Sequence, residues 1–202
     1  MIKQIESTIE IKIETIYDLL EAQKHFQLRL NNDVPQYITT TFKHVQTSIA
    51  QNVYQSIEFQ EFIEAEFEDD RKEELVDYLL FTLNKYIYLM DISVEKTYYD
   101  NVPLEDLFVS KSEMSVAACS NYAALEQNSY ISLLRNHCIF KPWKIHGENQ
   151  NCTNSEQVKL ALDKALFYLK QMIEIVFEDY DEFKRCLFYK IEKNIVRQIK
   201  GY

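Results

Sequence analysis

Glycine and proline are scarce in this chain, with only 2 Gly and 3 Pro among 202 residues. Glycine and proline commonly form the tight turns that connect strands, so their scarcity disfavours a sheet-rich fold. Apolar residues instead recur at steps of three and four, which is the period of an amphipathic helix. The sequence therefore predicts an all-α protein, an antiparallel helical bundle. At this length a single domain over 1–202 can bury a core without disulfides.

The apolar period and the capping signals divide the chain into segments. We expect helices over about 5–30, 41–67, 71–90 and 181–200, and two more that follow capping boxes at 110–113 and 153–156 and end near 134 and 177. Residues 93–110 and 137–154 read as irregular connections. The helix over 71–90 is apolar on much of its circumference, which predicts a central, buried position. The charged turn before it, 68–71, is short, so it should join two antiparallel neighbours.

Two predicted helices have a clear inward track. In the second helix it comprises Phe42, Val45, Ile49, Val53, Ile57 and Phe62. In the first helix it comprises Ile9, Ile13, Ile16, Leu20, Gln23, Gln27 and Leu30. Two of these positions are glutamines, and a buried amide must find hydrogen-bond partners. Gln23 and Gln27 could pack against other polar core groups, or they could recognise a planar ligand such as a uracil edge, which offers both donors and acceptors.

Two pairs of acids are the strongest functional signal. Glu58 and Glu61 lie three residues apart on one predicted helix, and Glu74 and Asp77 lie three residues apart on the next. Residues spaced in this way share a helix face, so the four carboxylates can converge between antiparallel helices. Mg²⁺, a hard cation that prefers oxygen ligands, would relieve their repulsion. The alternative is that they are solvated surface charges. Glu64 and Glu73 are nearby spare acids that could also serve as ligands.

A stripe of basic and amide side chains lies in the last predicted helix. Lys190, Asn194 and Arg197 follow one another at helical spacing in the last predicted helix. Such residues could complement the negative end of the helix dipole. In an acidic protein they could instead bind phosphate oxygens. Both interpretations remain open from the spacing alone.

Composition excludes several classes of function. A net charge of −10 disfavours nucleic acid or an anionic membrane as a partner. The glycines are isolated, so a Gly-rich phosphate loop is absent, and the four cysteines have no metal-ligand spacing. The N-terminal residues 1–14 carry acids where a signal peptide needs an apolar core, and no apolar run is long enough to span a bilayer. We therefore expect an intracellular, cytoplasmic protein with reduced thiols.

Together these residues resemble the all-α, dimeric dUTPases of the MazG-like nucleotide pyrophosphohydrolase superfamily, which are common in phages of Gram-positive bacteria. The resemblance lies in three blocks: DLLEAQKHFQLRL at 18–30, VYQSIEFQEF at 53–62 with EELVDYLLF at 73–81, and YKIEKNIVRQIKGY at 189–202. Residues 93–180 correspond to a region that varies within the family. The acidic segment EAEFEDD at 64–70 replaces the aromatic and lysine residues often found there.

The resemblance implies a homodimeric dUTP diphosphatase that forms dUMP and pyrophosphate from dUTP, or dUMP from dUDP. By this resemblance Glu58, Glu61, Glu74 and Asp77 would hold Mg²⁺, with Glu61 favoured over Glu58 as the general base. Gln23 would contact the base, and Gln27 stands where the family has Asn or Asp. Lys190, Asn194 and Arg197 would bind the phosphates, with Tyr202 close by.

Two alternatives stay open. The first is a related enzyme that acts on dCTP or on a broader set of nucleotides. The second is a scaffold that has lost catalysis and acts as an interaction protein, for example by binding a repressor, a role that the resemblance also suggests.

Overall fold

The computed structural model describes residues 13–30, 41–90, 102–108, 113–137 and 155–200. Within these ranges, residues 24–30, 41–52, 87–90, 130–137, 155, 156, 158 and 198–200 are described by their backbone alone. The described chain forms six α-helices and one short 3₁₀ helix: α1 (Ile16–Leu30), α2 (Thr41–Glu64), α3 (Glu68–Met90), η1 (Leu104–Leu107), α4 (Val116–His137), α5 (Ser155–Val176) and α6 (Tyr180–Lys200). The predicted all-α fold is confirmed.

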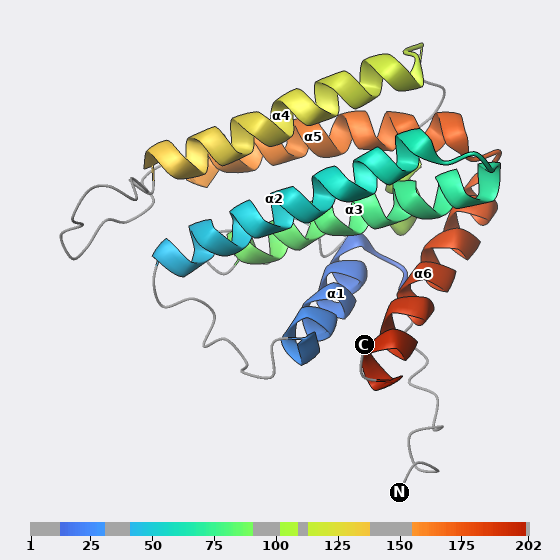
Figure 1. The fold of residues 1–202 in the computed structure, drawn as a ribbon, viewed down its shortest axis with the longest axis horizontal. Coiled ribbons are helices and arrows are strands. Elements are labelled where there is room, and N and C mark those ends of the chain that lie inside the picture. Colours follow the sequence, from blue (N-terminus) through green and yellow to red (C-terminus); the bar gives the residue numbers. More distant parts are fainter. Residues whose placement is uncertain (1–12, 31–40, 91–101, 109–112, 138–154, 201–202) are drawn as a thin grey trace, which may run out of the picture.

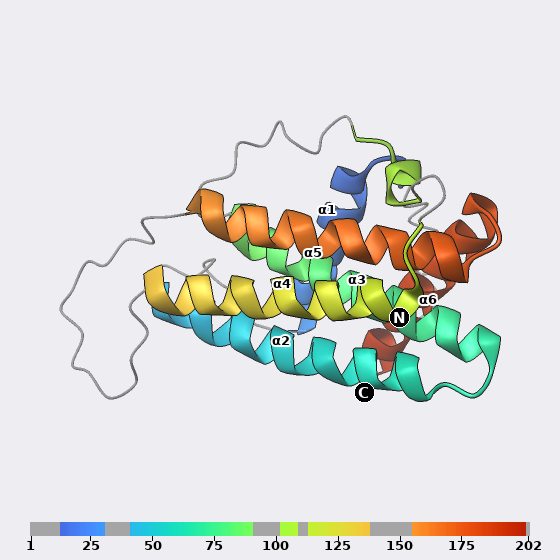
Figure 2. The same cartoon turned by 90° about the horizontal axis from the view of Figure 1, so that it is seen from above.

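Four long helices form a bundle, and two further helices pack against one of them. α2 contacts α3, α3 contacts α5, α5 contacts α4, and α4 contacts α2, which closes the ring (Figures 1 and 2). α1 and α6 lie beside each other and cross the bundle direction steeply where they contact α3 (Figure 1). α3 is therefore the central helix, as its apolar circumference predicts. Its leucines Leu75, Leu79 and Leu83 are fully buried.

A polar network lies inside the bundle, among α2, α3 and α4. The Lys85 ammonium donates hydrogen bonds to the side-chain oxygens of Gln55 and Gln127, the latter at 2.5 Å. The Thr82 hydroxyl accepts from both amide groups and donates to the Tyr78 carbonyl at 3.0 Å. These side chains are all buried. Each member thus has partners, which is the condition for keeping polar groups in a core.

Helix α1 begins later than the apolar period predicts. Ile13 and Glu14 are not helical, and Thr15 forms an isolated antiparallel bridge with Pro103. Asp18 accepts hydrogen bonds from the Thr15 amide at 2.9 Å and from the Glu14 amide at 3.0 Å, while the Thr15 hydroxyl accepts from the Asp18 amide at 3.1 Å. This reciprocal cap fixes the start of the helix. The expected stretch 5–12 lies outside the described residues.

Two other predicted boundaries are wrong. The run 68–71, expected as a turn, is the first turn of α3, and the actual connection is residues 65–67. Its acids stabilise this position because carboxylates favour the positive end of a helix. α4 begins at Val116 rather than after a cap at Ser110, and the Ser115 hydroxyl accepts from the Ala118 amide at 3.2 Å. Ser110 itself lies outside the described residues.

The predicted inward track of α2 is also wrong in part. Phe62 is buried, but Val53 and Ile57 are 56 % and 47 % exposed. The buried residue between them is Gln55, which belongs to the polar network. The helix is rotated so that Gln55 and Phe62 face the core, and two apolar residues are left on the surface. None of the described helices combines the length and apolar character needed to cross a membrane.

Candidate functional site

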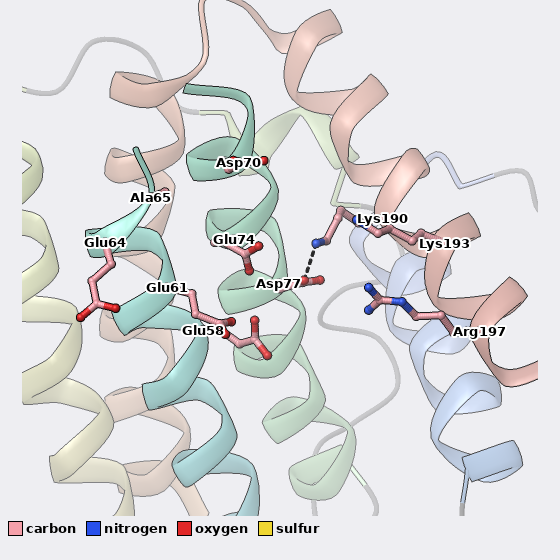
Figure 3. Close-up of a pocket in the computed structure, with 10 residues that line it drawn as sticks. All are labelled: Glu58, Glu61, Glu64, Ala65, Asp70, Glu74, Asp77, Lys190, Lys193 and Arg197. Carbon is pink, nitrogen blue, oxygen red and sulfur yellow. Dashed lines mark ion pairs between the residues drawn. The ribbon is translucent and has the colours of Figure 1, made fainter. Parts of the chain in front are cut away.

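Three acids from two helices meet at one place. Glu58 and Glu61 of α2 and Glu74 of α3 each offer a carboxylate oxygen, and these oxygens all lie within 4.8 Å of one another. Figure 3 shows the three side chains between the two helices. The predicted convergence of the two helices' acids is therefore present for three of the four residues. We call this group the acid cluster.

The packing of α2 on α3 places the acid cluster. Phe62 is buried and Phe59 half-buried, and the Phe59 ring lies 5.4 Å from the Tyr78 ring of α3. These aromatic contacts hold α2 in one rotation, because a helix that buries this face must turn Glu58 and Glu61 toward the open side of the α2–α3 pair. The short connection at 65–67 keeps the two helices antiparallel and adjacent.

The carboxylates of the acid cluster repel one another. Burial, together with the charges of Asp77, Glu61 and Glu74, raises the pKa of Glu58 to about 8. Burial also raises the pKa of Glu74, with Asp77 and Glu61 adding to the effect and Lys190 opposing it. The proximity of Glu74 adds to the raised pKa of Glu58. Without a cation, the cluster retains a proton near neutral pH.

The fourth predicted ligand, Asp77, has a different partner. Its carboxylate lies 2.6 Å from the Lys190 ammonium of α6, which is only 2 % exposed (Figure 3). Burial lowers the pKa of Lys190, but hydrogen bonding to Asp77 and the charges of Asp77, Glu74 and Glu73 outweigh it, so that the pKa is raised. Lys190 is therefore a buried cation at the border of the acid cluster.

A cleft of about 550 Å³ opens over these groups. Its acidic wall comes from α2 and α3, and its basic wall comes from α6, with Lys190, Lys193 and Arg197 facing the acids (Figure 3). The complete lining is Glu58, Glu61, Glu64, Ala65, Asp70, Glu74, Asp77, Lys190, Lys193 and Arg197. Carboxylates opposite cations suit a ligand that is a complex of a divalent cation with a polyphosphate.

Other predicted site residues lie elsewhere. Asn194 is half-buried on α6 and does not line the cleft, and Gln23 is 3 % exposed on α1 and does not line it either. The side chain of Gln27 and the whole of Tyr202 lie outside the described residues. Glu64 lines the cleft but points away from the acid cluster (Figure 3).

Sequence reasoning missed Lys193. It lines the basic wall together with Lys190 and Arg197. The signal was available, because Lys193 lies one helical turn from each of the other two and so shares their face. Glu73 was considered only as a spare metal ligand, but it contacts the two lysines of α6.

No protein-family model matches this chain, and no curated protein or solved structure matches it either. The inference about function therefore depends on the geometry of the cleft and on the three sequence blocks.

Proposed function

We propose that this protein hydrolyses nucleoside triphosphates to the monophosphate and pyrophosphate with the help of a divalent cation, and that its substrate is dUTP. The observation that carries the proposal is the meeting of Glu58, Glu61 and Glu74 opposite the basic wall of α6. The choice of dUTP rests on the resemblance of the three sequence blocks alone, because Gln23, the residue that the resemblance assigns to the base, is buried and does not line the cleft.

The acid cluster fits Mg²⁺. All three donors are carboxylates, which this cation prefers. Burial and the neighbouring acids raise the pKa of Glu58 and of Glu74, so a cation would compete there with a proton. Glu58, Glu61 and Glu74 would hold the cation, and Asp77 would join them if Lys190 moved to a phosphate. Bound Mg²⁺ would neutralise phosphate charge and make the α-phosphorus easier to attack.

The residues of the cleft have separate roles in this mechanism. Glu61 is the exposed member of the acid cluster, and we assign it the role of general base, which accepts a proton from the attacking water. The water oxygen bonds to the α-phosphorus as the bond to the bridging oxygen breaks, and pyrophosphate leaves. Lys190, Lys193 and Arg197 would stabilise the charge that develops on the departing phosphates.

The test is a hydrolysis panel of dUTP, dUDP, dCTP and dTTP with Mg²⁺, with dUMP and pyrophosphate identified as products. Equal rates on dUTP and dTTP would exclude uracil selectivity and leave a broader pyrophosphohydrolase. We expect Glu74→Gln to abolish turnover in a folded protein. Glu64→Gln, which removes the same charge from the same cleft but not from the acid cluster, should keep most of it.

Association is part of the proposal. The resemblance implies a homodimer, and the exposed Val53 and Ile57 on α2 give an apolar surface on which a second copy could pack. The molar mass from light scattering tests this directly. A monomer at micromolar concentration would remove the dimer from the proposal.

A second candidate is an interaction protein that retains the scaffold without catalysis, for example one that binds a repressor. The same exposed apolar side chains favour it, together with Phe67, which is 69 % exposed. Calorimetric titration with a non-hydrolysable dUTP analogue, with and without Mg²⁺, separates the candidates. Absence of both nucleotide binding and turnover in the folded wild-type protein would favour the interaction protein.

A further inference from the structure

Glu73 and Glu74 are neighbours in sequence but contact residues of different helices. Glu74 belongs to the acid cluster with α2, whereas Glu73 faces α6 and lies 2.8 Å from Lys193 and 3.3 Å from Lys190. Consecutive helical residues differ by about 100° in direction, so the two carboxylates cannot share one ligand set. Glu73 is thus paired with two lysines of the basic wall.

Lys190 stands between two acids of α3. Asp77 lies 2.6 Å from its ammonium group and Glu73 lies 3.3 Å from it, one helical turn apart. Asp77 lines the cleft, and Glu73 does not. Glu73 therefore holds Lys190 from outside the cleft, while Asp77 contacts it from within.

The first half of α6 has its own attachment to α3. Lys72 lies 2.7 Å from Glu182 near the start of α6 and 2.7 Å from Glu68. The basic wall lies further along α6, where Glu73 reaches two of its cations. In the described part of the chain, the ion pairs between α3 and this part of α6 are those of Glu73 with both lysines and of Asp77 with Lys190.

We propose that Glu73 is a positioning residue that holds Lys190 and Lys193 in place to receive the phosphates of the ligand, and that it is not a metal ligand. This inference rests on the proposed function, because it assumes that the cleft takes a polyphosphate with a divalent cation. When such a ligand enters, Lys190 exchanges Asp77 for phosphate oxygens, and Glu73 keeps both lysines directed at the cleft. Asp77 is then available to the cation.

Removing the charge of Glu73 should weaken the binding of a phosphate ligand, although electrostatic repulsion alone predicts tighter binding. Glu73→Gln removes a negative charge near a phosphate site, which by Coulomb's law alone would tighten anion binding. If Glu73 positions the lysines, inorganic triphosphate in the presence of Mg²⁺ should instead bind about fivefold more weakly, as expected for loss of a partly exposed ion pair worth about 1 kcal/mol. Glu73→Asp keeps the charge and should restore part of the affinity.

Asp70→Asn is the matched control. Asp70 is exposed, lines the same cleft from α3, and forms no ion pair with either lysine in the described part of the chain. We expect this variant to bind triphosphate as well as the wild type or more tightly. Mg²⁺ alone should bind to Glu73→Gln and Asp70→Asn equally well. If Glu73→Gln alone lost Mg²⁺ binding, Glu73 would be a metal ligand and the inference would be overturned.

Kinetics with dUTP give a second readout. Misplaced lysines should lower kcat/KM about fivefold or more, with KM raised because the lysines also bind the phosphates of the substrate, whereas a partly unfolded variant would lower kcat at unchanged KM. Unaltered or tighter triphosphate binding by Glu73→Gln, with normal wild-type binding, refutes the positioning role and leaves the proposed function standing. A wild-type protein that binds no triphosphate refutes both. A wild-type protein that binds triphosphate but hydrolyses no nucleotide refutes the proposed function alone.

Discussion

The buried lysine of the bundle makes stability depend on pH in a way that one substitution should remove. Lys85 is 0 % exposed, and its ammonium group is surrounded by the amide oxygens of Gln55 and Gln127. Lys85→Met replaces the charged end by an apolar group of similar length. The variant removes the cost of burying a charge but leaves two amide oxygens without this hydrogen-bond donor, so these two effects oppose each other in the free energy of unfolding. Only the first effect changes with pH, so the pH dependence of the free energy of unfolding reports on the charge of Lys85.

The sign and the size of this pH dependence of the free energy of unfolding follow from the pKa of Lys85. Burial lowers the pKa of Lys85 from 10.5 to about 7. Between these values the unfolded chain binds a proton at Lys85 that the folded protein does not, so the free energy of unfolding rises with pH. The slope is at most about 1.4 kcal/mol per pH unit, and the whole interval corresponds to roughly 5 kcal/mol. The destabilisation is fully present below pH 7 and is relieved as the pH approaches 10.5.

Urea unfolding at pH 7, 8 and 9 measures this slope in the wild type and in Lys85→Met. The difference between the two proteins is the relevant quantity, because Glu58 and Cys186, whose pKa values burial raises to about 8 and about 12, titrate in both. We expect the wild type to gain about 1 kcal/mol per pH unit relative to the variant. Lys164→Met, an exposed change on α5, is the control and should leave the slope unaltered. A constant difference from pH 7 to 9 would refute the reasoning.

Three further predictions concern the site, the core and a helix start. Because the pKa of Glu58 is about 8, Mg²⁺ binding at pH 7 should release close to one proton and tighten about tenfold per pH unit up to pH 8; calorimetry in two buffers of different ionisation heat detects this, and binding without proton release would contradict it. Leu79→Ala, at a fully buried position of α3, should lower the free energy of unfolding by about 2–5 kcal/mol in a denaturant titration. Thr15→Ala should cost about 1 kcal/mol and speed amide exchange in the first turn of α1, whereas unchanged exchange would show that the cap is not needed.

The helical fold was predictable because its signals are local. Scarce glycine and proline and the apolar steps of three and four depend only on neighbouring residues, and they place α3 in the centre correctly. The errors arise where a polar residue has a structural role. Gln55 faces the core in place of Val53 and Ile57 because it bonds to Lys85, and a count of apolar residues cannot reveal such a pairing.

The predicted starts of two helices, α1 and α3, were wrong for a related reason. The acids at 68–70 look like a solvated turn, but they stabilise the first turn of α3 through its dipole. Thr15 and Asp18 form a cap inside a run whose apolar spacing continues on both sides of it. Periodicity shows which residues could share a face, whereas the cap decides where the helix begins.

The sequence predicted the acid pairs and two cations of the basic wall, Lys190 and Arg197, but not how the two walls meet. Glu58 with Glu61, and Glu74 with Asp77, are pairs whose shared direction follows from spacing within a helix. The contact between Lys190 and Glu73 joins residues 117 positions apart, and it depends on how α6 is rotated against α3. No local pattern determines that rotation, so the sequence could not show that a lysine already neutralises Asp77.

This difference between the acids bears on whether the acid cluster is a site or a group of surface charges. The protein provides Lys190 and Lys193 for Glu73 and Asp77, yet Glu58, Glu61 and Glu74 lie together on the opposite wall. Solvated surface acids lower their repulsion by diverging, but packing of Phe59 and Phe62 on α3 holds these within 4.8 Å of one another. Below about pH 8 a proton on Glu58 relieves the repulsion. Above that pH the proton is lost, and a hard divalent cation bound by these carboxylate oxygens, as we propose, would give the same relief.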